Sequence, residues 1–251
     1  MSGSVKLMSD QILIHGLQYG IYILEAVLCL LLASQGRWRQ HKGLCLYVTL
    51  LFALDGVARP AVLNYFGRAS LQFAYFYWLT DVALALGAFL LICSFFRRAC
   101  TREERLWRFV RLLLVFVFVL VVAISFLALS RHYSQLYTRF IVEFSQNLYF
   151  ACLILNTMLY VMIQQIAIDD DELGLLVGGI GVQFAGEAAG LALYHLTLGE
   201  PFVQIVFSLL NPACTLGMLL TWVYAIVKTP QAVPVRSQRG KQAALVEAVA
   251  D

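Results

Sequence analysis

Ionisable side chains interrupt the long apolar stretches of this 251-residue chain. The chain is 61% hydrophobic and only 13% charged, a composition that fits lipid rather than water as its solvent. An ionisable group in the hydrocarbon of a bilayer is costly, so it usually faces other helices or a water-filled cavity, where it handles ions, protons or ligands. These residues are Glu25, Asp55, Arg59, Asp81 and Glu187.

Asp55 and Arg59 are four residues apart, so they share one face of a helix and can neutralise each other. Pro60 follows at once, and because proline lacks a backbone donor, it predicts a kink at this point. Two interpretations stay open. The pair can simply make its helix tolerable in lipid, or Arg59 can hold an anionic group beside the kink.

Asp81 and Glu187 have no basic residue three or four positions away. Each must therefore find a partner on another helix, remain protonated or face water. Such a carboxyl group can carry a proton through a transport or switching cycle, or it can make one interhelical hydrogen bond. Gln183 and Asn211 lie at similar depths, and Pro212 predicts a kink beside Asn211. We expect a ligand or ion pocket, reachable from outside, that is formed by Asp55, Arg59, Asp81, Gln183, Glu187 and Asn211.

Several aromatic residues lie shortly before Asp81 in the sequence, among them Tyr75, Tyr77 and Trp78. An acid framed by aromatic faces suits an organic cation. The same residues also fit an ordinary aromatic belt at the membrane surface. We regard them as a possible aromatic lining of the pocket.

Seven stretches are long and apolar enough to cross a bilayer, which requires about 20 residues each. The sequence therefore predicts an all-α polytopic membrane protein, a seven-helix bundle over residues 1–228, followed by a flexible cytoplasmic tail over residues 229–251. The predicted helices are 11–34, 43–66, 72–96, 109–130, 137–163, 173–197 and 202–228.

Lys and Arg are retained on the cytoplasmic side of short loops, and this sets the orientation. With the N-terminus outside and the C-terminus inside, thirteen of the 18 basic residues fall on the inner side and five on the outer side. We therefore expect a multi-pass protein of the cell (plasma or inner) membrane with an outside N-terminus and a cytoplasmic C-terminus.

The predicted helices differ in their surfaces. The helix over 109–130 has no Asn, Gln or His and suits a position against lipid. The helix over 173–197 carries the small-xxx-small pairs Gly174/Gly178 and Gly186/Gly190, which favour a central, closely packed position. The acidic run over 169–172 suits the positive N-terminal end of that helix and can supply its cap, or it can dock a basic partner.

Catalytic and metal-binding patterns are not found. The six cysteines show no CxxC pair and no Cys/His ligand spacing, and there is no GxSxG, HExxH or P-loop motif. We therefore expect no enzyme activity, no metal, no cofactor and no nucleic-acid partner.

One internal comparison concerns the predicted third and seventh helices. Residues 79–83, with Leu86 and Gly87, parallel residues 209–213, with Leu216 and Gly217. This pattern resembles the three-plus-one-plus-three arrangement of SWEET-type sugar transporters, whose halves are parallel. The proline positions of that family are missing from this chain, so the resemblance assigns no family.

Three functions stay open. A small-solute or proton-linked transporter is favoured, because it needs no output domain. A seven-helix receptor or sensory subunit would signal through a protein partner at its cytoplasmic loops. A structural subunit of a larger membrane complex would use the same charges for pairing between helices. In each case the partners are the lipid bilayer and a small molecule, an ion or a protein.

Overall fold

The computed structural model describes residues 2–34, 41–67, 70–101, 103–129, 136–165, 170–197 and 201–228, and every element within these ranges is a helix. Seven helices are long and apolar enough to cross a membrane, which is compatible with an integral, multi-pass membrane protein. The elements are α1 (Ser2–Ser34), α2 (Lys42–Leu51), η2 (Phe52–Ala58), α3 (Arg59–Phe66), α4 (Leu71–Ala99), α5 (Glu104–Leu129), α6 (Leu136–Gln165), α7 (Asp171–Thr197) and α8 (Pro201–Lys228).

The predicted helix bounds match these elements to within a few residues, except at two starts. α1 begins at Ser2 instead of near residue 11, because the helix continues past the end of its apolar run. α5 begins at Glu104 instead of residue 109, because a charged first turn precedes its apolar part. The proposed tail over residues 229–251 lies outside the described residues.

The second span is one continuous helical segment with an irregular middle. It comprises α2, a π-helical stretch (η2) and α3. Pro60 stands in the first turn of α3 and cannot donate to the carbonyl group four residues earlier, while its ring crowds that carbonyl. The expected kink therefore takes the form of a widened turn that contains Asp55.

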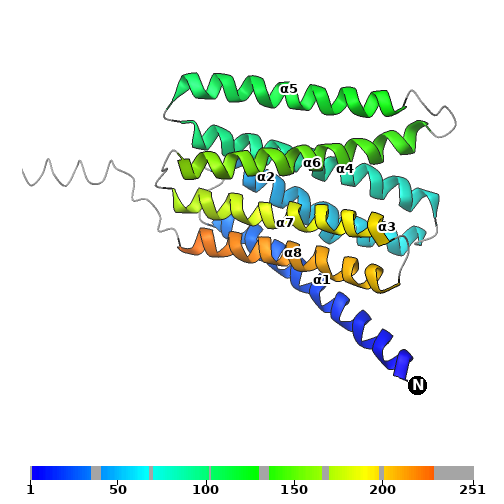
Figure 1. Ribbon diagram of the computed structural model, residues 1–251. Coiled ribbons are helices and arrows are strands. Elements are labelled where there is room, and N and C mark those ends of the chain that lie inside the picture. Colours follow the sequence, from blue (N-terminus) through cyan, green and yellow to red (C-terminus); the bar gives the residue numbers. More distant parts are fainter. Residues whose placement is uncertain are drawn as a thin grey trace, which may run out of the picture.

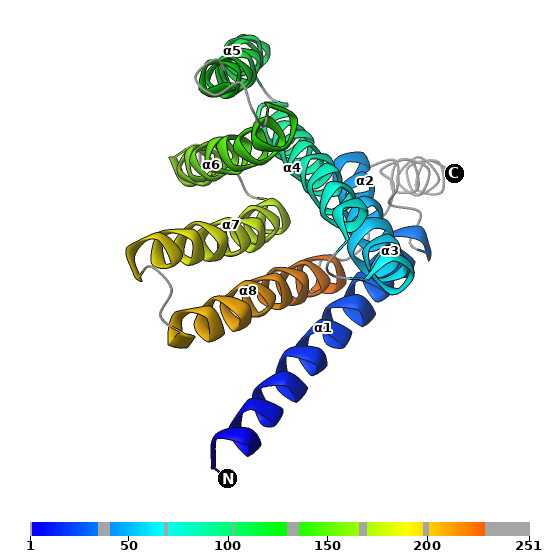
Figure 2. The same ribbon diagram turned by 90° about the vertical axis from the view of Figure 1, so that its right-hand side faces the viewer.

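Six spans form a closed ring, and Figure 2 shows them side by side. Their order around the ring is α1, the second span, α4, α6, α7 and α8, which returns to α1. α5 lies outside this ring against α6 and α4. The N-terminal part of α1 diverges from the bundle in both views (Figures 1 and 2).

The position of α5 agrees with the prediction of a lipid-facing helix. Its outward face is apolar and open, with Phe109, Leu112 and Phe116 each more than 60% exposed. Such a continuous apolar face is unfavourable in water and favourable in a bilayer.

Glycines allow α7 to approach its neighbours closely. A Cβ atom added at Gly179 would stand 2.9 Å from the Trp222 ring of α8. One added at Gly186 would stand 2.8 Å from Cys214 Cβ, also on α8. These two glycines are seven residues apart, so they lie on one stripe of α7 that faces α8.

The predicted pair Gly174/Gly178 is not part of this contact. A Cβ atom added at either position would meet nothing within 4 Å among the described residues. Of the two predicted pairs, Gly186/Gly190 therefore contributes Gly186 to the stripe that faces α8, whereas Gly178 lies about 100° around the helix from Gly179 and off that stripe.

The bundle is filled most tightly toward one end, where α4 ends and α7 begins. Trp222 of α8 is completely buried there and donates from Nε1 to the Leu176 carbonyl of α7 at 2.9 Å. Its ring also meets Tyr47 of α2 edge-on, with centroids 6.0 Å apart. Other large buried side chains of this tight half are Leu32, Leu44, Leu91, Ile92, Phe96, Leu159 and Leu173.

Candidate functional site

A cavity of about 310 Å³ lies in the opposite half of the bundle, between α4, α6 and α7, with one residue from α8. Three of its lining residues are exposed at the surface of the bundle, Tyr77, Gln146 and Phe150, so the cavity is reachable from the protein surface. Its lining residues are Tyr77, Trp78, Asp81, Val142, Ser145, Gln146, Tyr149, Phe150, Leu153, Phe184, Glu187, Ala188 and Asn211.

Two carboxyl groups face this cavity from different helices. Asp81 comes from the third turn of α4, and Glu187 comes from the second half of α7. Glu187 accepts a hydrogen bond from Gln183 Nε2 at 2.8 Å, one turn earlier on α7. Asp81 interacts with the Ser145 hydroxyl group of α6. Each acid therefore has a polar neighbour that positions it, and neither has a bidentate cationic partner.

Among the described basic residues, Arg59 forms the ion pair with an acid of the cavity, and it lies behind the cavity wall instead of in it. Its guanidinium group bonds to Asp55 Oδ1 at 2.5 Å and donates from Nε to Thr80 Oγ1 at 2.9 Å. The Asp81 carboxylate is more distant, at 3.8 Å. The guanidinium carbon also stacks 4.3 Å from the centroid of the Tyr77 ring. Arg59 thus belongs mainly to Asp55.

Aromatic rings form much of the wall. Tyr77 and Trp78 of α4 line the cavity, together with Tyr149, Phe150 and Phe184. Tyr75 does not line it; the ring is 49% exposed and packs edge-on against Trp78 at 5.9 Å. Tyr75 therefore supports the wall from outside.

The structure brings together some of the predicted pocket residues and separates others. Asp81, Glu187 and Asn211 share the cavity. Asp55 and Arg59 lie behind it, linked to it through Asp81, and Gln183 touches it only through its bond to Glu187. The second span, which was expected to line the pocket with Asp55 and Arg59, therefore does not line it, and α6 lines it instead.

α6 was the wall that sequence reasoning missed. It contributes Ser145, Gln146 and Tyr149 to the cavity. The signal was present, because Ser145, Gln146 and Asn147 form a polar triplet within an apolar stretch. Asn147 itself turns away and donates to Ser125 of α5 at 3.1 Å, so only part of the triplet serves the cavity.

Asn211 adds an unused acceptor at the cavity. Its side-chain oxygen is buried and has no hydrogen-bond partner among the described residues. Pro212 follows inside the continuous helix α8. An orphaned buried acceptor that lines a cavity suits a ligand with an N–H or O–H donor.

Carboxyl groups outnumber basic groups around the cavity. Asp81 and Glu187 line it and Asp55 lies behind it, whereas Arg59, which lies near Asp55 and Asp81, is the basic group described beside them. The described part of the chain contains no group of three or more His, Cys, Asp or Glu side chains that could hold a metal ion. The excess negative charge therefore has to be balanced by protons or by a cation with few ligands from the protein.

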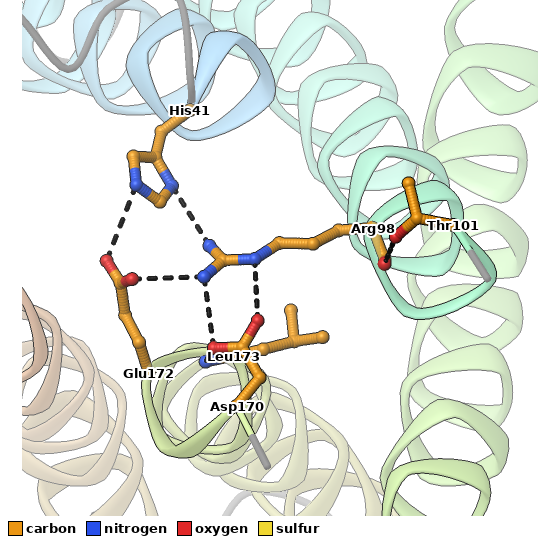
Figure 3. A network of polar contacts seen from close by, with 6 residues as sticks. All are labelled: His41, Arg98, Thr101, Asp170, Glu172 and Leu173. Atoms are coloured by element: carbon orange, nitrogen blue, oxygen red, sulfur yellow. Dashed lines mark hydrogen bonds and ion pairs between the residues drawn. The ribbon is translucent and has the colours of Figure 1, made fainter. Parts of the chain in front are cut away.

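A second polar cluster closes the other end of the bundle, and Figure 3 shows Arg98 of α4 at its centre. Arg98 donates to both carboxylate oxygens of Asp170, at 2.9 and 3.0 Å, and to Glu172 Oε2 at 3.0 Å. His41, which precedes α2, lies 3.2 Å from Arg98 and 3.4 Å from Glu172 Oε1. We call these four residues the Arg98 cluster.

The Arg98 cluster explains part of the acidic run. Asp170 Oδ1 accepts from the Leu173 backbone N–H at 3.0 Å, so Asp170 caps the start of α7, as one of the two interpretations proposed. Among the described residues, Arg98 of the same chain pairs with Asp170 and Glu172 of this run, and His41 also lies close to Glu172. Asp169 lies outside the described residues.

Comparison of the chain with protein-family models, with curated proteins and with solved structures gave no match. The resemblance to a three-plus-one-plus-three arrangement therefore stays a prediction. The ring order is compatible with it, since α5 lies outside two groups of three spans. The same order around the ring also arises when consecutive spans simply pack beside one another, with no internal sequence repeat.

Proposed function

We propose that this protein binds a small organic cation in the cavity between α4, α6 and α7 and carries it across the membrane. The observation that supports this proposal best is the pairing of Asp81 and Glu187 across one aromatic-walled cavity. In the proposed orientation the N-terminus is outside, the C-terminus is cytoplasmic, and the protein resides in the plasma or inner membrane.

The charge balance favours a cation over an anion. Arg59 is engaged by Asp55, so it leaves Asp81 and Glu187 without a full counter-charge. An anionic ligand would meet two carboxyl groups, and like charges at close range repel strongly in a low-dielectric site. An ammonium group between the two acids would instead supply the missing positive charge and donate hydrogen bonds.

The shape and lining favour an organic cation over a simple ion. A cavity of about 310 Å³ is large enough for a small molecule and much larger than a desolvated metal ion. Trp78 and Tyr149 bring aromatic rings to the lining, and aromatic rings attract ammonium groups and pack against apolar parts of a ligand. Asn211 can accept a further donor.

The position of the cavity along the bundle suits one state of a transport cycle, in which the site is open to one side of the membrane. It lies in the half that contains the first turns of α4, α6 and α8, whereas the tight half and the Arg98 cluster fill the other end. With the N-terminus outside, this arrangement corresponds to a site open to the outside and closed to the cytoplasm. Transport then requires the Arg98 cluster to open.

The test uses phenethylammonium as the probe and phenethyl alcohol as its neutral control. The protein is reconstituted in nanodiscs for saturable binding and in liposomes for uptake of labelled probe. We expect binding of the ammonium and not of the alcohol. Asp81→Asn and Glu187→Gln should each weaken binding by about tenfold or more, because each removes one close charge interaction worth 1–3 kcal/mol. Glu103→Gln, an exposed acid beside α5, is the matched control.

The outcomes separate the candidate functions. Saturable binding with uptake that both variants lose supports a transporter. Binding without uptake would replace transport by a receptor or sensory role. If the ammonium and the alcohol bind equally, or if both variants bind normally, the pocket assignment is wrong.

A further inference from the structure

Glu25 of α1 is a buried acid that the cavity does not use. Its side chain is 1% exposed, and neither carboxyl oxygen has a hydrogen-bond partner among the described residues. It does not line the cavity. Burial of an ionised carboxylate without a partner is much more costly than burial of the neutral acid, so such a group is suited to hold and release a proton.

Glu25 packs against the π-helical stretch of the second span. A Cβ atom added at Gly56 would stand 3.5 Å from Glu25 Oε2 and 3.2 Å from the Phe52 ring. Gly56 therefore provides the space in which the carboxyl group lies. The irregular turn created by Pro60 is thus the surface that Glu25 faces.

The widened turn also leaves one backbone carbonyl of η2 without a helical donor. The Arg59 backbone N–H bonds to the Leu54 carbonyl, and residue 60 is proline. The Asp55 carbonyl therefore lacks both of the backbone donors, at i+4 and i+5, that a helix of either kind would supply. A neutral carboxylic acid brings an O–H donor to the segment in which that acceptor is free.

The titratable groups around Glu25 come from its own helix and from two neighbours. The charged group with the main electrostatic effect on it is Asp55 of η2. Its other titratable neighbours are Tyr22 and Cys29 of α1 and Tyr47 of α2. α8, which also packs on α1, has no Asp, Glu, His, Lys or Arg between residues 209 and 227. Asp55 is therefore the charged group that a change of charge at Glu25 affects most.

Arg59 connects Asp55 to the cavity. It bonds to Asp55 and lies 3.8 Å from Asp81, which lines the cavity. One guanidinium group thus has an acid on either side. A second negative charge at Glu25 would draw it further toward Asp55 and away from Asp81. Asp81 would then be left with a greater need for a cation.

We propose that Glu25 is a proton-binding site coupled to the cavity through Asp55 and Arg59, such that loss of its proton strengthens binding of an organic cation at Asp81. The coupling rests on the proposed function. By linkage, cation binding then releases the Glu25 proton to the buffer, and the protein exchanges a proton for its cation.

The test compares wild type, Glu25→Gln and the control Glu103→Gln in nanodiscs. Phenethylammonium binding is measured by titration calorimetry in buffers with different heats of ionisation, which gives the number of protons released. We expect Glu25→Gln to bind the probe but to release up to about half a proton fewer than wild type, which is the most that a tenfold coupling can displace. Its affinity should match wild type in acidic buffer and be about tenfold weaker in alkaline buffer. Glu103→Gln should behave as wild type.

Infrared difference spectra of the unliganded proteins, acidic minus alkaline, test the proton site by itself. Wild type and Glu103→Gln should show the C=O band of a protonated carboxyl group in apolar surroundings, and Glu25→Gln should lack part of it. Absence of probe binding to wild type would overturn the proposed function and the coupling, while the infrared band still decides the proton site. Unchanged proton release and an unchanged band in Glu25→Gln would overturn the proposal.

Discussion

Two arginines of this bundle, Arg59 and Arg98, each lie between two carboxyl groups, and they do so in different ways. Arg98 donates three hydrogen bonds of 2.9–3.0 Å to Asp170 and Glu172. Arg59 bonds to Asp55, but Asp81 lies 3.8 Å away and faces a cavity. Arg98 therefore forms hydrogen bonds with both of its acids, whereas Arg59 bonds closely to Asp55 and only approaches Asp81.

This difference distinguishes a cluster that holds helix ends together from a site that can bind a further cation. Around Arg98 each acid is held at bonding distance, and the cluster joins the start of α2, the end of α4 and the start of α7. Around Arg59 one acid is left for another cation. Packing follows the same division, because Trp222 and its neighbours fill the tight half, whereas the other half holds a cavity of about 310 Å³.

Arg98→Gln should give the largest loss of stability. It leaves Asp170 and Glu172 together without their shared cation, and breaking a buried ion pair costs up to 3–5 kcal/mol. Because Arg98 is 27% exposed, we expect about 2–4 kcal/mol, measured by equilibrium unfolding in mixed micelles. A loss no greater than that of Arg59→Gln would remove the distinction between the two arginines.

Gly179→Ala should destabilise the tight half by about 1–3 kcal/mol, because the new methyl group meets the buried Trp222 ring at 2.9 Å. Gly178→Ala is the matched control one position away. It meets nothing within 4 Å, so it should be neutral or stabilise the helix by up to about 1 kcal/mol. Thermal unfolding of both variants checks this, and equal effects would contradict the packing described for α7 and α8.

Arg59→Gln should have the smallest effect on stability and a distinct effect on binding. Arg59 is 15% exposed and so more buried than Arg98, but Asp55 can take up a proton when it loses its partner, so we expect a loss of only about 1 kcal/mol. Asp81 loses a competing cation, so phenethylammonium should bind several-fold more tightly. Binding titration in nanodiscs measures this, and unchanged or weaker binding would show that Arg59 does not compete for Asp81.

The fold was predictable because the spans depend on apolar length alone, which seven stretches satisfy. The site was predictable only in part. Asp81 and Glu187 stood out as unpaired acids, but which helices enclose them depends on how the helices turn toward one another. That rotation is set by contacts such as Gly179 with Trp222, which residue spacing within a single helix does not specify.

The Arg98 cluster was beyond sequence reasoning for a related reason. His41, Arg98 and Glu172 stand near the ends of different helices, and basic residues at such ends are expected for topology alone. Only the ring order brings the end of α4 beside the start of α7. By contrast, the cap at Asp170 is local and could be predicted.

The most direct test of the cation site is a crystal structure with para-bromophenethylammonium, whose bromine gives an anomalous signal. We expect a single bromine peak among the rings of the cavity, with the ammonium group between Asp81 and Glu187. A saturably bound probe whose bromine lies outside this cavity would contradict it.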